Sequence, residues 1–297
     1  MGVPYAEVIG DPIVQSKSPV IHKYWLEQLG IEADYRATRV TGAGLSSYLE
    51  ERQADPYWRG CNVTMPHKQA ITLLLDLVAD EGIGAVNCVV PDAGRLIGRN
   101  TDAPGFLRAL ETAPPFEGPP VVNHVATHFH LIGAGGAARA VAAALRGLDI
   151  DYFNRDAVKA EDLAEEFGPG RGYGHGRGLE ALGGGADYEF DSAYPAVKPN
   201  SGAEQRYSFI VVNASSMGMA GYPPVPIALE SYPADTIVCE LVYHPLETPL
   251  LRDAKRLGLR TVDGLAMLIG QARYAFEHFF GVAPPDGDDE LRELLTS

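Results

Sequence analysis

Residues 128–155 read HFHLIGAGGAARAVAAALRGLDIDYFNR and decide the fold of the second half of the chain. An apolar strand leads into a GxGxxA turn made by Gly133, Gly135 and Ala138, and an alanine-rich helix follows directly. A second strand follows about 20 residues later, which is the spacing of a strand–helix–strand unit. Glycines in this context form a tight turn and let a pyrophosphate approach the N-terminus of the helix. The stretch therefore favours a Rossmann-type dinucleotide-binding domain over a purely structural turn.

The end of that second strand indicates which nucleotide is preferred. Asn154 is followed there by Arg155, and Lys159 comes one helical turn later, where an NAD site usually has a carboxylate. Two cations suit a 2′-phosphate, so NADP is the expected cofactor. Asp156 is able to accept the ribose hydroxyls of NAD instead, so dual specificity stays open. An ordinary surface role for Arg155 is the alternative.

Regular patterns resume after a stretch of poor periodicity. Residues 167–207 carry many glycines and indicate a loop or a degraded strand–helix–strand unit. Apolar runs and amphipathic segments follow them. The expected elements are strands at 209–215, 236–243 and 260–264, and helices at 249–258 and 265–281.

The first half of the chain also alternates strands with helices. Its expected elements are strands at 6–10, 33–40, 61–64 and 85–90, and helices at 19–30, at 44–54, after Pro66 and from near Pro104. This alternation predicts a parallel sheet with helices on its faces. Residues 111–122 are rich in Pro and Gly and make a plausible linker. The chain is therefore predicted to be an α/β protein of two domains.

Composition limits the partners that we expect. The formal net charge of −15 would repel a phosphate backbone, so nucleic acid is not an expected partner. The sequence has neither an apolar run of membrane-spanning length nor an export signal, so we expect no membrane partner and a cytoplasmic location. The three cysteines lie far apart and are expected to be reduced core residues. Monomer and homodimer both stay open.

Two ionisable residues follow strands of the first predicted sheet. Lys68 comes after the strand at 61–64, and Asp102 comes shortly before the helix near Pro104. Reducing a ketone by hydride requires a proton donor for the developing alkoxide, and a lysine held by a carboxylate can be that donor. A solvated Lys68 and an Asp102 that only caps the helix are the alternatives.

Several short segments make a more specific pattern together than any does alone. In chain order they are SKSP (16–19), NVTMPHK (62–68), AVN (85–87), NTD (100–102), GAGGAAR (133–139), NR (154–155), VNASSMGM (212–219), ELVYHPLETPLL (240–251) and DGLAMLIGQA (263–272). In this order they resemble the shikimate dehydrogenase family, and the resemblance runs from residue 5 to about residue 282.

The resemblance implies an oxidoreductase activity. The implied reaction is the reversible NADPH-dependent reduction of 3-dehydroshikimate to shikimate, or of a closely related cyclic hydroxy acid, in aromatic amino acid biosynthesis through chorismate. Lys68 and Asp102 match the catalytic pair of the family. A quinate/shikimate dehydrogenase with NAD or dual cofactor use, and a non-catalytic ligand-binding paralogue, are the alternatives. Retention of the catalytic pair argues against the paralogue.

The resemblance also implies binding residues and domain roles. The substrate-binding residues are Ser16, Ser18 and Tyr243 for the carboxylate, and Thr64, Asn87 and Gln271 for ring hydroxyls. The predicted cofactor-binding residues are Gly133, Ala134, Gly135, Gly136, Ala137, Asn154, Arg155, Lys159, Met217 and Gly264. We predict that residues 1–106 and 265–297 form the substrate-binding catalytic domain, with the C-terminal helices returning to it, and that residues 107–264 form the NADP-binding Rossmann-like domain. Helix caps are the alternative roles of Ser18 and Thr64.

Four positions depart from the family pattern. Cys88, Ala103, Asp156 and Lys159 stand where threonine, glycine, threonine and arginine are common. No departure removes a group from the catalytic pair, so they indicate a divergent member.

A histidine cluster precedes the glycine turn. His124, His128 and His130 lie close together in the sequence, and strand alternation puts the last two on one face. With no carboxylate or cysteine near them in the sequence, we predict no metal site.

Overall fold

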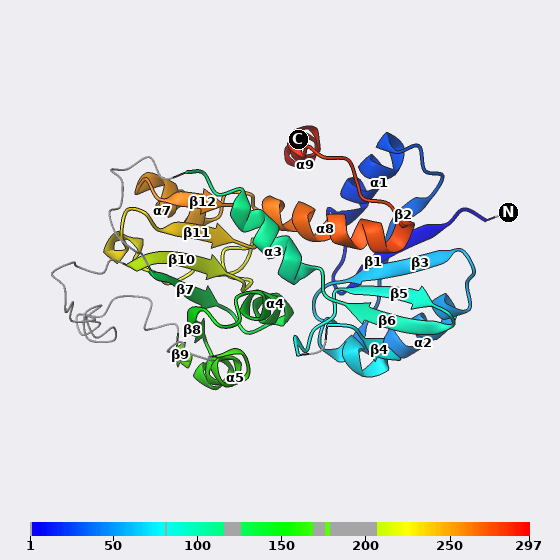
Figure 1. Ribbon diagram of the computed structural model, residues 1–297, viewed down its shortest axis with the longest axis horizontal. Coiled ribbons are helices and arrows are strands. Elements are labelled where there is room, and N and C mark those ends of the chain that lie inside the picture. Colours follow the sequence, from blue (N-terminus) through cyan, green and yellow to red (C-terminus); the bar gives the residue numbers. More distant parts are fainter. Residues whose placement is uncertain (1, 81, 116–125, 169–175, 179–206) are drawn as a thin grey trace. The chain divides into compact units, whose positions relative to one another are not determined.

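The computed structural model describes residues 2–80, 82–115, 126–168, 176–178 and 207–297 (Figure 1). Its backbone contacts divide the chain into two compact units, Met1–Arg108 with Met267–Ser297, and Ala109–Ala266. We name these the first unit and the second unit. The predicted α/β fold is confirmed, and the C-terminal helices belong largely to the first unit. His124 and most of the glycine-rich segment 167–207 lie outside the described residues.

The first unit is built on a six-stranded sheet in the order β2-β1-β3-β5-β6-β4 (Figure 1). The strands are β1 (Tyr5–Gly10), β2 (Asp34–Arg39), β3 (Trp58–Val63), β4 (Leu77–Val78), β5 (Cys88–Asp92) and β6 (Arg95–Arg99). The helices that contribute to this unit are α1 (Ser18–Gln28), α2 (Leu45–Gln53), α3 (Asp102–Glu111), α8 (Gly264–Phe280) and α9 (Asp289–Thr296), with 3₁₀ turns η1 (Gly42–Gly44) and η2 (Ala70–Leu74).

The prediction that this sheet is parallel is wrong for one part of it. β1 pairs in parallel with β2 and β3, but β5 runs antiparallel to both β3 and β6. The reversal between β5 and β6 is a hairpin with Ala93 and Gly94 at its tip, where φ is 47° and 79°. Two successive positive φ angles suit a two-residue turn that matches the twist of the strands, and this turn replaces a crossover helix.

The segment around Pro66 and Asn87 also differs from the prediction. The expected helix after Pro66 is a turn followed by the short 3₁₀ helix η2. The carbonyl of Lys68 accepts a hydrogen bond from the N–H of Val86 at 2.8 Å. In an α-helix this carbonyl would bond to the next turn, but here it bonds to a segment distant in the sequence. The expected strand 85–90 begins only at Cys88, and Asn87 lies just before it.

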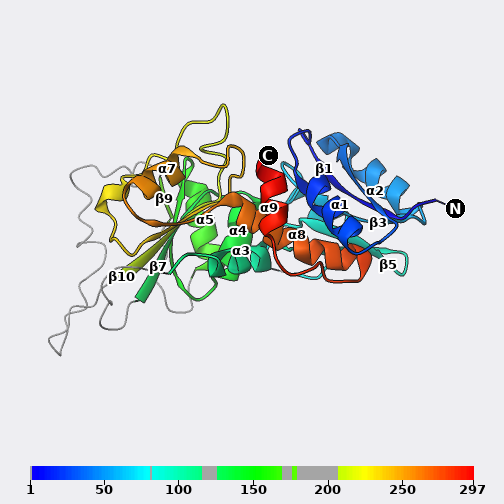
Figure 2. The same ribbon diagram turned by 90° about the horizontal axis from the view of Figure 1, so that it is seen from above.

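Alternating residues of β1 pack on the two faces of the sheet. Ile9 joins a buried cluster with Leu49 of α2, whereas Val8 joins a cluster with Phe279 of α8. α1 lies on the same side as α8, because His22 of α1 contacts aromatic rings of α8 (Figures 1 and 2). This sheet is therefore covered on both faces, as α/β architecture requires.

The second unit contains a wholly parallel sheet in the order β12-β11-β10-β7-β8-β9. Its strands are β7 (Ala126–Ile132), β8 (Asp149–Asn154), β9 (Gly176–Gly178), β10 (Tyr207–Asn213), β11 (Ile237–Glu240) and β12 (Arg260–Val262). Its helices are α4 (Gly136–Ala144), α5 (Ala157–Phe167) and α7 (Pro249–Arg256), with the 3₁₀ turn η4 (Leu229–Ser231). Counted from β7, this is the 3-2-1-4-5-6 order of dinucleotide-binding Rossmann folds.

Cys61, Cys88 and Cys239 are all buried and carry no disulfide, as expected for core residues. Within the described part of the chain, no helix combines the length and the apolar character that a membrane crossing demands.

His22 is a buried histidine in an aromatic cluster of the first unit. Its ring stacks on that of Tyr35, with centroids 3.9 Å apart, and meets the rings of Trp25 and Phe276 at 5.8 Å. The side chain is fully buried, and this burial lowers the pKa of His22 to about 3. The histidine is therefore neutral in the folded chain at pH values where an unfolded chain would protonate it.

We expect His22 to make the stability of the first unit depend on pH. Between about pH 6.5 and pH 3 the unfolded chain binds a proton at this position that the folded chain does not, so stability falls as pH falls, by up to about 1.4 kcal/mol per pH unit. His22→Phe keeps the ring stacking and should flatten this slope in denaturant melts between pH 7 and pH 4. His244→Gln, at an exposed histidine, is the control and should keep the wild-type slope. An equal slope in His22→Phe and wild type would contradict the assignment.

Candidate active site

Lys68 and Asp102 form an ion pair in the first unit. Nζ of Lys68 donates to Oδ2 of Asp102 at 2.5 Å, and the two side chains are only 16% and 6% exposed. Lys68 lies in the turn after β3, and Asp102 is the first residue of α3. The capping alternative for Asp102 is wrong, because Oδ1 of Asn100 accepts the N–H groups of Asp102 and Ala103. The Asp102 carboxylate is thus directed at Lys68.

Asn87 holds the second oxygen of this carboxylate. Its Nδ2 donates to Oδ1 of Asp102 and to Oγ1 of Thr101, both at 2.9 Å, and lies 3.4 Å from Oε1 of Gln271. Its Oδ1 accepts the N–H of Thr101 at 2.7 Å. Thr101 was not among the predicted site residues. The structure therefore brings Lys68, Asn87, Asp102 and Gln271 together. The buried carboxylate of Asp102 accepts a hydrogen bond at each oxygen, one from Lys68 and one from Asn87.

A close approach of two helices places Gln271 in this group. A Cβ at Gly105 of α3 would lie 2.5 Å from the backbone N of Gln271 in α8, and a Cβ at Gly270 would lie 2.7 Å from the carbonyl O of Gly105. Any side chain at Gly105 would therefore separate α3 from α8. Glycine at this point is the local reason that residues of two helices far apart in the chain share one site.

Ser16, Ser18 and Thr64 lie in the first unit, and among the described residues no hydrogen bond joins them to the ion pair. Oγ of Ser16 accepts the N–H of Ser18 at 3.3 Å, and Ser18 is the first residue of α1, so its expected capping alternative is wrong. Lys17 between them donates from Nζ to the carbonyl of Leu295 in α9 at 2.5 Å. Thr64 is half-buried directly after β3, and the 3₁₀ helix η2 begins only at Ala70 with Gln69 as its N-cap, so Thr64 does not cap it. The serine loop is thus anchored by the C-terminal helix.

The glycine turn of the second unit has the geometry of a phosphate cradle. Gly133 has φ +118°, donates its N–H to the carbonyl of Phe153 at 2.8 Å, and would place a Cβ 2.9 Å from the carbonyl O of Ala214. Gly135 precedes α4 in an extended conformation, and a Cβ there would meet nothing within 4 Å. Open backbone at the N-terminus of a nine-residue helix fits the pyrophosphate of a dinucleotide.

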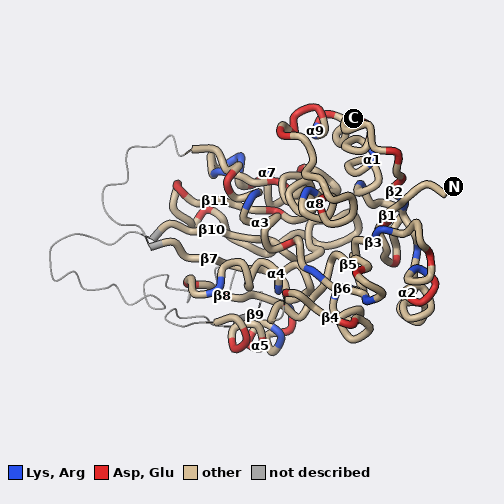
Figure 3. The backbone as a smooth tube through the Cα atoms, turned by 45° about the vertical axis from the view of Figure 1, so that its right-hand side comes forward, with Lys and Arg blue, Asp and Glu red and all other residues tan. Residues whose placement is uncertain are grey.

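Cations lie where β8 ends and α5 begins. Arg155 and Lys159 are exposed, and Asn154 is half-buried with its Nδ2 donating to the carbonyl of Asp156 at 3.2 Å. Asp156 is also exposed, and its side chain makes no capping hydrogen bond within the described part of α5. Figure 3 shows acidic positions along α5, so a bound 2′-phosphate would depend on these local cations.

A buried network that the sequence reasoning missed holds the loop of Met217. Nδ2 of Asn213 donates to the carbonyl of Met217 at 2.9 Å and to Oε1 of Glu240 at 2.8 Å, and Oγ1 of Thr248 donates to Oε2 of Glu240 at 2.9 Å. Burial raises the pKa of Glu240 to about 7. Asn213 and Glu240 end the adjacent strands β10 and β11, and polar residues at the carboxyl ends of parallel strands are the signal that would have found them.

Gly264 and Tyr243 lie together at the start of α8. A Cβ at Gly264 would fall 2.4 Å from the carbonyl O of Val242. Glycine therefore permits the start of α8 to lie against the backbone at Val242. Tyr243 is half-buried, and burial raises the pKa of its hydroxyl. Tyr243 belongs to the second unit, unlike the other predicted substrate residues.

Asp151 corrects the view that no carboxylate accompanies the histidines. It lies on β8, and its Oδ2 is 3.5 Å from Nε2 of His128 and 4.0 Å from Nε2 of His130. Sequence distance concealed this neighbour, because it comes from the adjacent strand.

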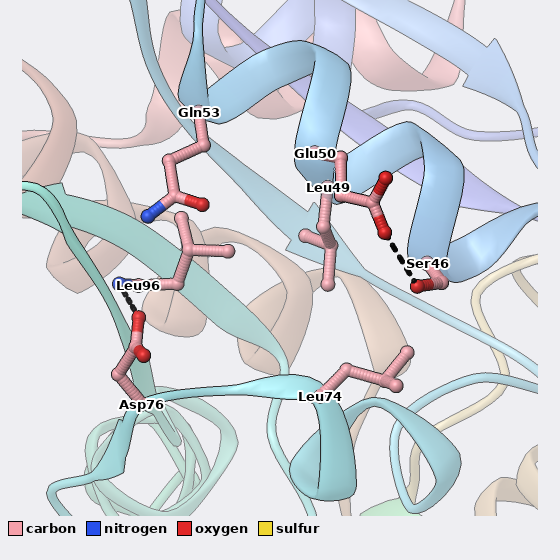
Figure 4. A pocket seen from close by; sticks show the side chains of 7 residues that line it. All are labelled: Ser46, Leu49, Glu50, Gln53, Leu74, Asp76 and Leu96. Carbon is pink, nitrogen blue, oxygen red and sulfur yellow. Dashed lines mark hydrogen bonds between the residues drawn. The ribbon is translucent and has the colours of Figure 1, made fainter.

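A separate pocket of the first unit contains none of the predicted site residues (Figure 4). Its lining residues are Ser46, Leu49, Glu50, Gln53, Leu74, Asp76 and Leu96. Oγ of Ser46 already donates to Glu50, and Oδ2 of Asp76 accepts the N–H of Leu96. These polar groups stabilise the local structure.

A Rossmann sheet with a glycine turn and a second α/β unit with a lysine–carboxylate pair define a class of two-unit α/β oxidoreductases. A curated shikimate dehydrogenase (NADP(+)) of Sphingopyxis alaskensis is 48% identical over 99% of this chain and 97% of its own length. The family model for the shikimate dehydrogenase substrate binding domain matches residues 8–89. The chain belongs to the shikimate dehydrogenase family.

Solved structures of the family have the same fold. Shikimate 5-dehydrogenase from Thermus thermophilus, in complex with NADP(H) and shikimate, is 36% identical with a TM-score of 0.74 and 95% coverage of each chain. Quinate dehydrogenase from Corynebacterium glutamicum in complex with NAD is 30% identical with a TM-score of 0.74, covering 99% of this chain and 98% of its own.

Proposed function

We propose that this chain catalyses the reversible reduction of 3-dehydroshikimate to shikimate, with NADPH as the reductant. The observation that carries the proposal is the 2.5 Å ion pair between Lys68 and Asp102, in a chain 48% identical to a curated NADP-dependent shikimate dehydrogenase. A fixed ammonium group suits a reaction that creates negative charge on oxygen.

Lys68 is the proton donor in this proposal. When bound, NADPH supplies a hydride to the carbonyl carbon of the substrate. The former carbonyl oxygen takes a proton from Nζ of Lys68 and becomes the hydroxyl, and the neutral lysine regains a proton from solvent. In the reverse direction the neutral amine accepts the hydroxyl proton. Asp102 orients the ammonium group. Asn87 keeps the carboxylate in place, because its Nδ2 donates a hydrogen bond to Oδ1 of Asp102.

The remaining polar residues of the first unit would bind the substrate. We assign Ser16 and Ser18 to its carboxylate, and Thr64, Asn87 and Gln271 to its ring hydroxyls, with Tyr243 of the second unit as a further carboxylate contact. Leaving a buried donor or acceptor unmatched costs about 1 to 3 kcal/mol, so such a set would discriminate between hydroxyl patterns.

The second unit would bind NADP. The open backbone at Gly135 and the exposed Arg155 and Lys159 support a pyrophosphate and a 2′-phosphate, respectively. The residues that we assign to the cofactor are Gly133, Ala134, Gly135, Gly136, Ala137, Asn154, Arg155, Lys159, Met217 and Gly264. The exposed carboxylate of Asp156 favours NAD as a second, weaker cofactor.

A cytoplasmic location, a chorismate-pathway role and a monomeric or homodimeric state are predictions from the sequence.

Wild-type turnover tests the proposal directly. We expect NADPH absorbance to fall when 3-dehydroshikimate is added, and NADP to be reduced when shikimate is added. Faster oxidation of quinate with NAD would favour a quinate dehydrogenase instead. Tight binding of shikimate in calorimetry without turnover on any of these pairs would favour the non-catalytic paralogue.

Lys68→Ala should lower kcat by about 10² to 10⁴-fold, because it removes general acid–base help, while the Kd for NADPH stays unchanged. Lys23→Ala is the matched control, since Lys23 forms an exposed ion pair with Asp34 at 3.1 Å in the same unit, and it should keep the wild-type kcat. Asp102→Asn should be nearly as harmful as Lys68→Ala, and the double variant should lose far less than the product of the two effects. Near-normal kcat in Lys68→Ala, with an isotope effect that makes hydride transfer rate-limiting, would remove Lys68 from the mechanism.

Arg155→Ala should narrow the preference for NADP over NAD. A charge-assisted contact to phosphate contributes about 1.5 to 3 kcal/mol, so kcat/KM for NADP should fall roughly 10- to 100-fold while the value for NAD changes little. Arg256→Ala is the control, because Arg256 is an exposed arginine of the same unit that pairs with Glu230. Equal losses for both cofactors would show that Arg155 does not read the 2′-phosphate.

A further inference from the structure

Three potential metal ligands meet on one face of the sheet in the second unit. His128 and His130 lie two residues apart on β7, so both side chains point to the same face. Asp151 lies on the neighbouring strand β8, in register with His130. All three residues are buried, with at most 2% of their surface exposed. The cluster thus combines two imidazoles and a carboxylate from two adjacent strands.

The distances within this cluster suit ligands arranged around one ion. Nε2 of His128 and Nε2 of His130 lie 3.5 Å and 4.0 Å from Oδ2 of Asp151. One ligand atom from each residue falls within 4.8 Å of the others. Ligand atoms around a tetrahedral zinc ion lie roughly 3.3 to 3.6 Å apart, given metal–ligand bonds of about 2.0 to 2.2 Å. A modest contraction would therefore bring all three into coordination range.

A tyrosine supports the protonation state that coordination needs. Nδ1 of His130 lies 2.7 Å from the hydroxyl oxygen of Tyr232. When Nδ1 carries the proton and donates to this oxygen, Nε2 keeps a lone pair, and Nε2 is the atom directed at Asp151. A metal-ligating histidine usually donates its other ring N–H in this way.

Aromatic rings of described residues lie beside the cluster. The ring of His130 contacts those of Phe153, Phe209 and Tyr232, with centroids 5.2 to 5.5 Å apart. A divalent cation between Asp151 and the imidazoles would interact favourably with the carboxylate oxygen and with both imidazole nitrogens.

We propose that His128, His130 and Asp151 bind a Zn²⁺ ion between β7 and β8. Imidazole nitrogens with a carboxylate oxygen form a ligand set that zinc accepts in proteins. The two strands lead into the glycine turn at Gly133 and into Arg155 (Figure 1). The ion would thus brace the strands that present the proposed cofactor site. It takes no part in the proposed hydride and proton transfers.

Zinc binding by the full chain, prepared without an affinity tag and stripped with a chelator, tests the proposal. We expect one equivalent of Zn²⁺ to bind in competition with a chromophoric chelator and to raise the Tm. X-ray absorption of the zinc-loaded protein should show nitrogen and oxygen ligands without sulfur, because none of the three buried cysteines belongs to the cluster.

Variants of the cluster assign the bound ion to these residues. Asp151→Asn and His130→Gln should each weaken zinc binding by at least about 100-fold, and Tyr232→Phe should weaken it about 10-fold, as expected for an outer partner. His22→Phe, at a buried histidine of the first unit, is the control and should keep the full stoichiometry.

Three results would overturn the proposal. They are a wild-type protein that binds no zinc at equimolar concentration, sulfur among the observed ligands, and undiminished binding in folded Asp151→Asn and His130→Gln. Where a variant fails to fold, wild-type stoichiometry and X-ray absorption still decide. Dehydrogenase turnover is measured separately with the metal-free protein, so failure of the zinc site and failure of the proposed function are distinguishable.

Discussion

The ion pair between Lys68 and Asp102 is the interaction on which the arrangement of the first unit depends. A partly buried lysine and aspartate are stable together only when further hydrogen bonds satisfy their remaining polar atoms. Asn87 supplies one of these bonds to Asp102, and Asn87 in turn lies beside Gln271. The pair therefore requires four segments to meet at one point: the turn after β3, the start of β5, α3 and α8.

Several irregular features of the first unit serve this meeting. The antiparallel hairpin of β5 and β6 brings Asn87 and Asp102 to the same end of the sheet, where a crossover helix would have taken the chain to a distant strand. In the turn after β3, the carbonyl of Lys68 accepts a hydrogen bond from the N–H of Val86, and the lysine side chain is directed at Asp102. Gly105 then allows α3 and α8 to touch. Local deviations from regular α/β structure thus build the geometry of the proposed catalytic pair.

The second unit follows a similar principle with different groups. Its parallel strands end in polar residues, and Asn213 and Glu240 use buried hydrogen bonds to fix the loop that carries Met217. Deeper in the same sheet, Asp151 meets two histidines of the neighbouring strand. Both groups are polar contacts within an apolar sheet, and both depend on the register between adjacent strands.

The sequence by itself determined the alternating elements, the glycine turn at Gly133, the cations that follow β8 and the motifs of the family, because periodicity and turn chemistry act over a few residues. It predicted Lys68 and Asp102 as a pair, but it missed the β5–β6 hairpin, Glu240 and the carboxylate beside the histidines. Only the tertiary structure decided these, since strand order and register bring together residues that no local pattern connects. For the same reason, a local motif can identify a site residue but cannot show which residues surround it.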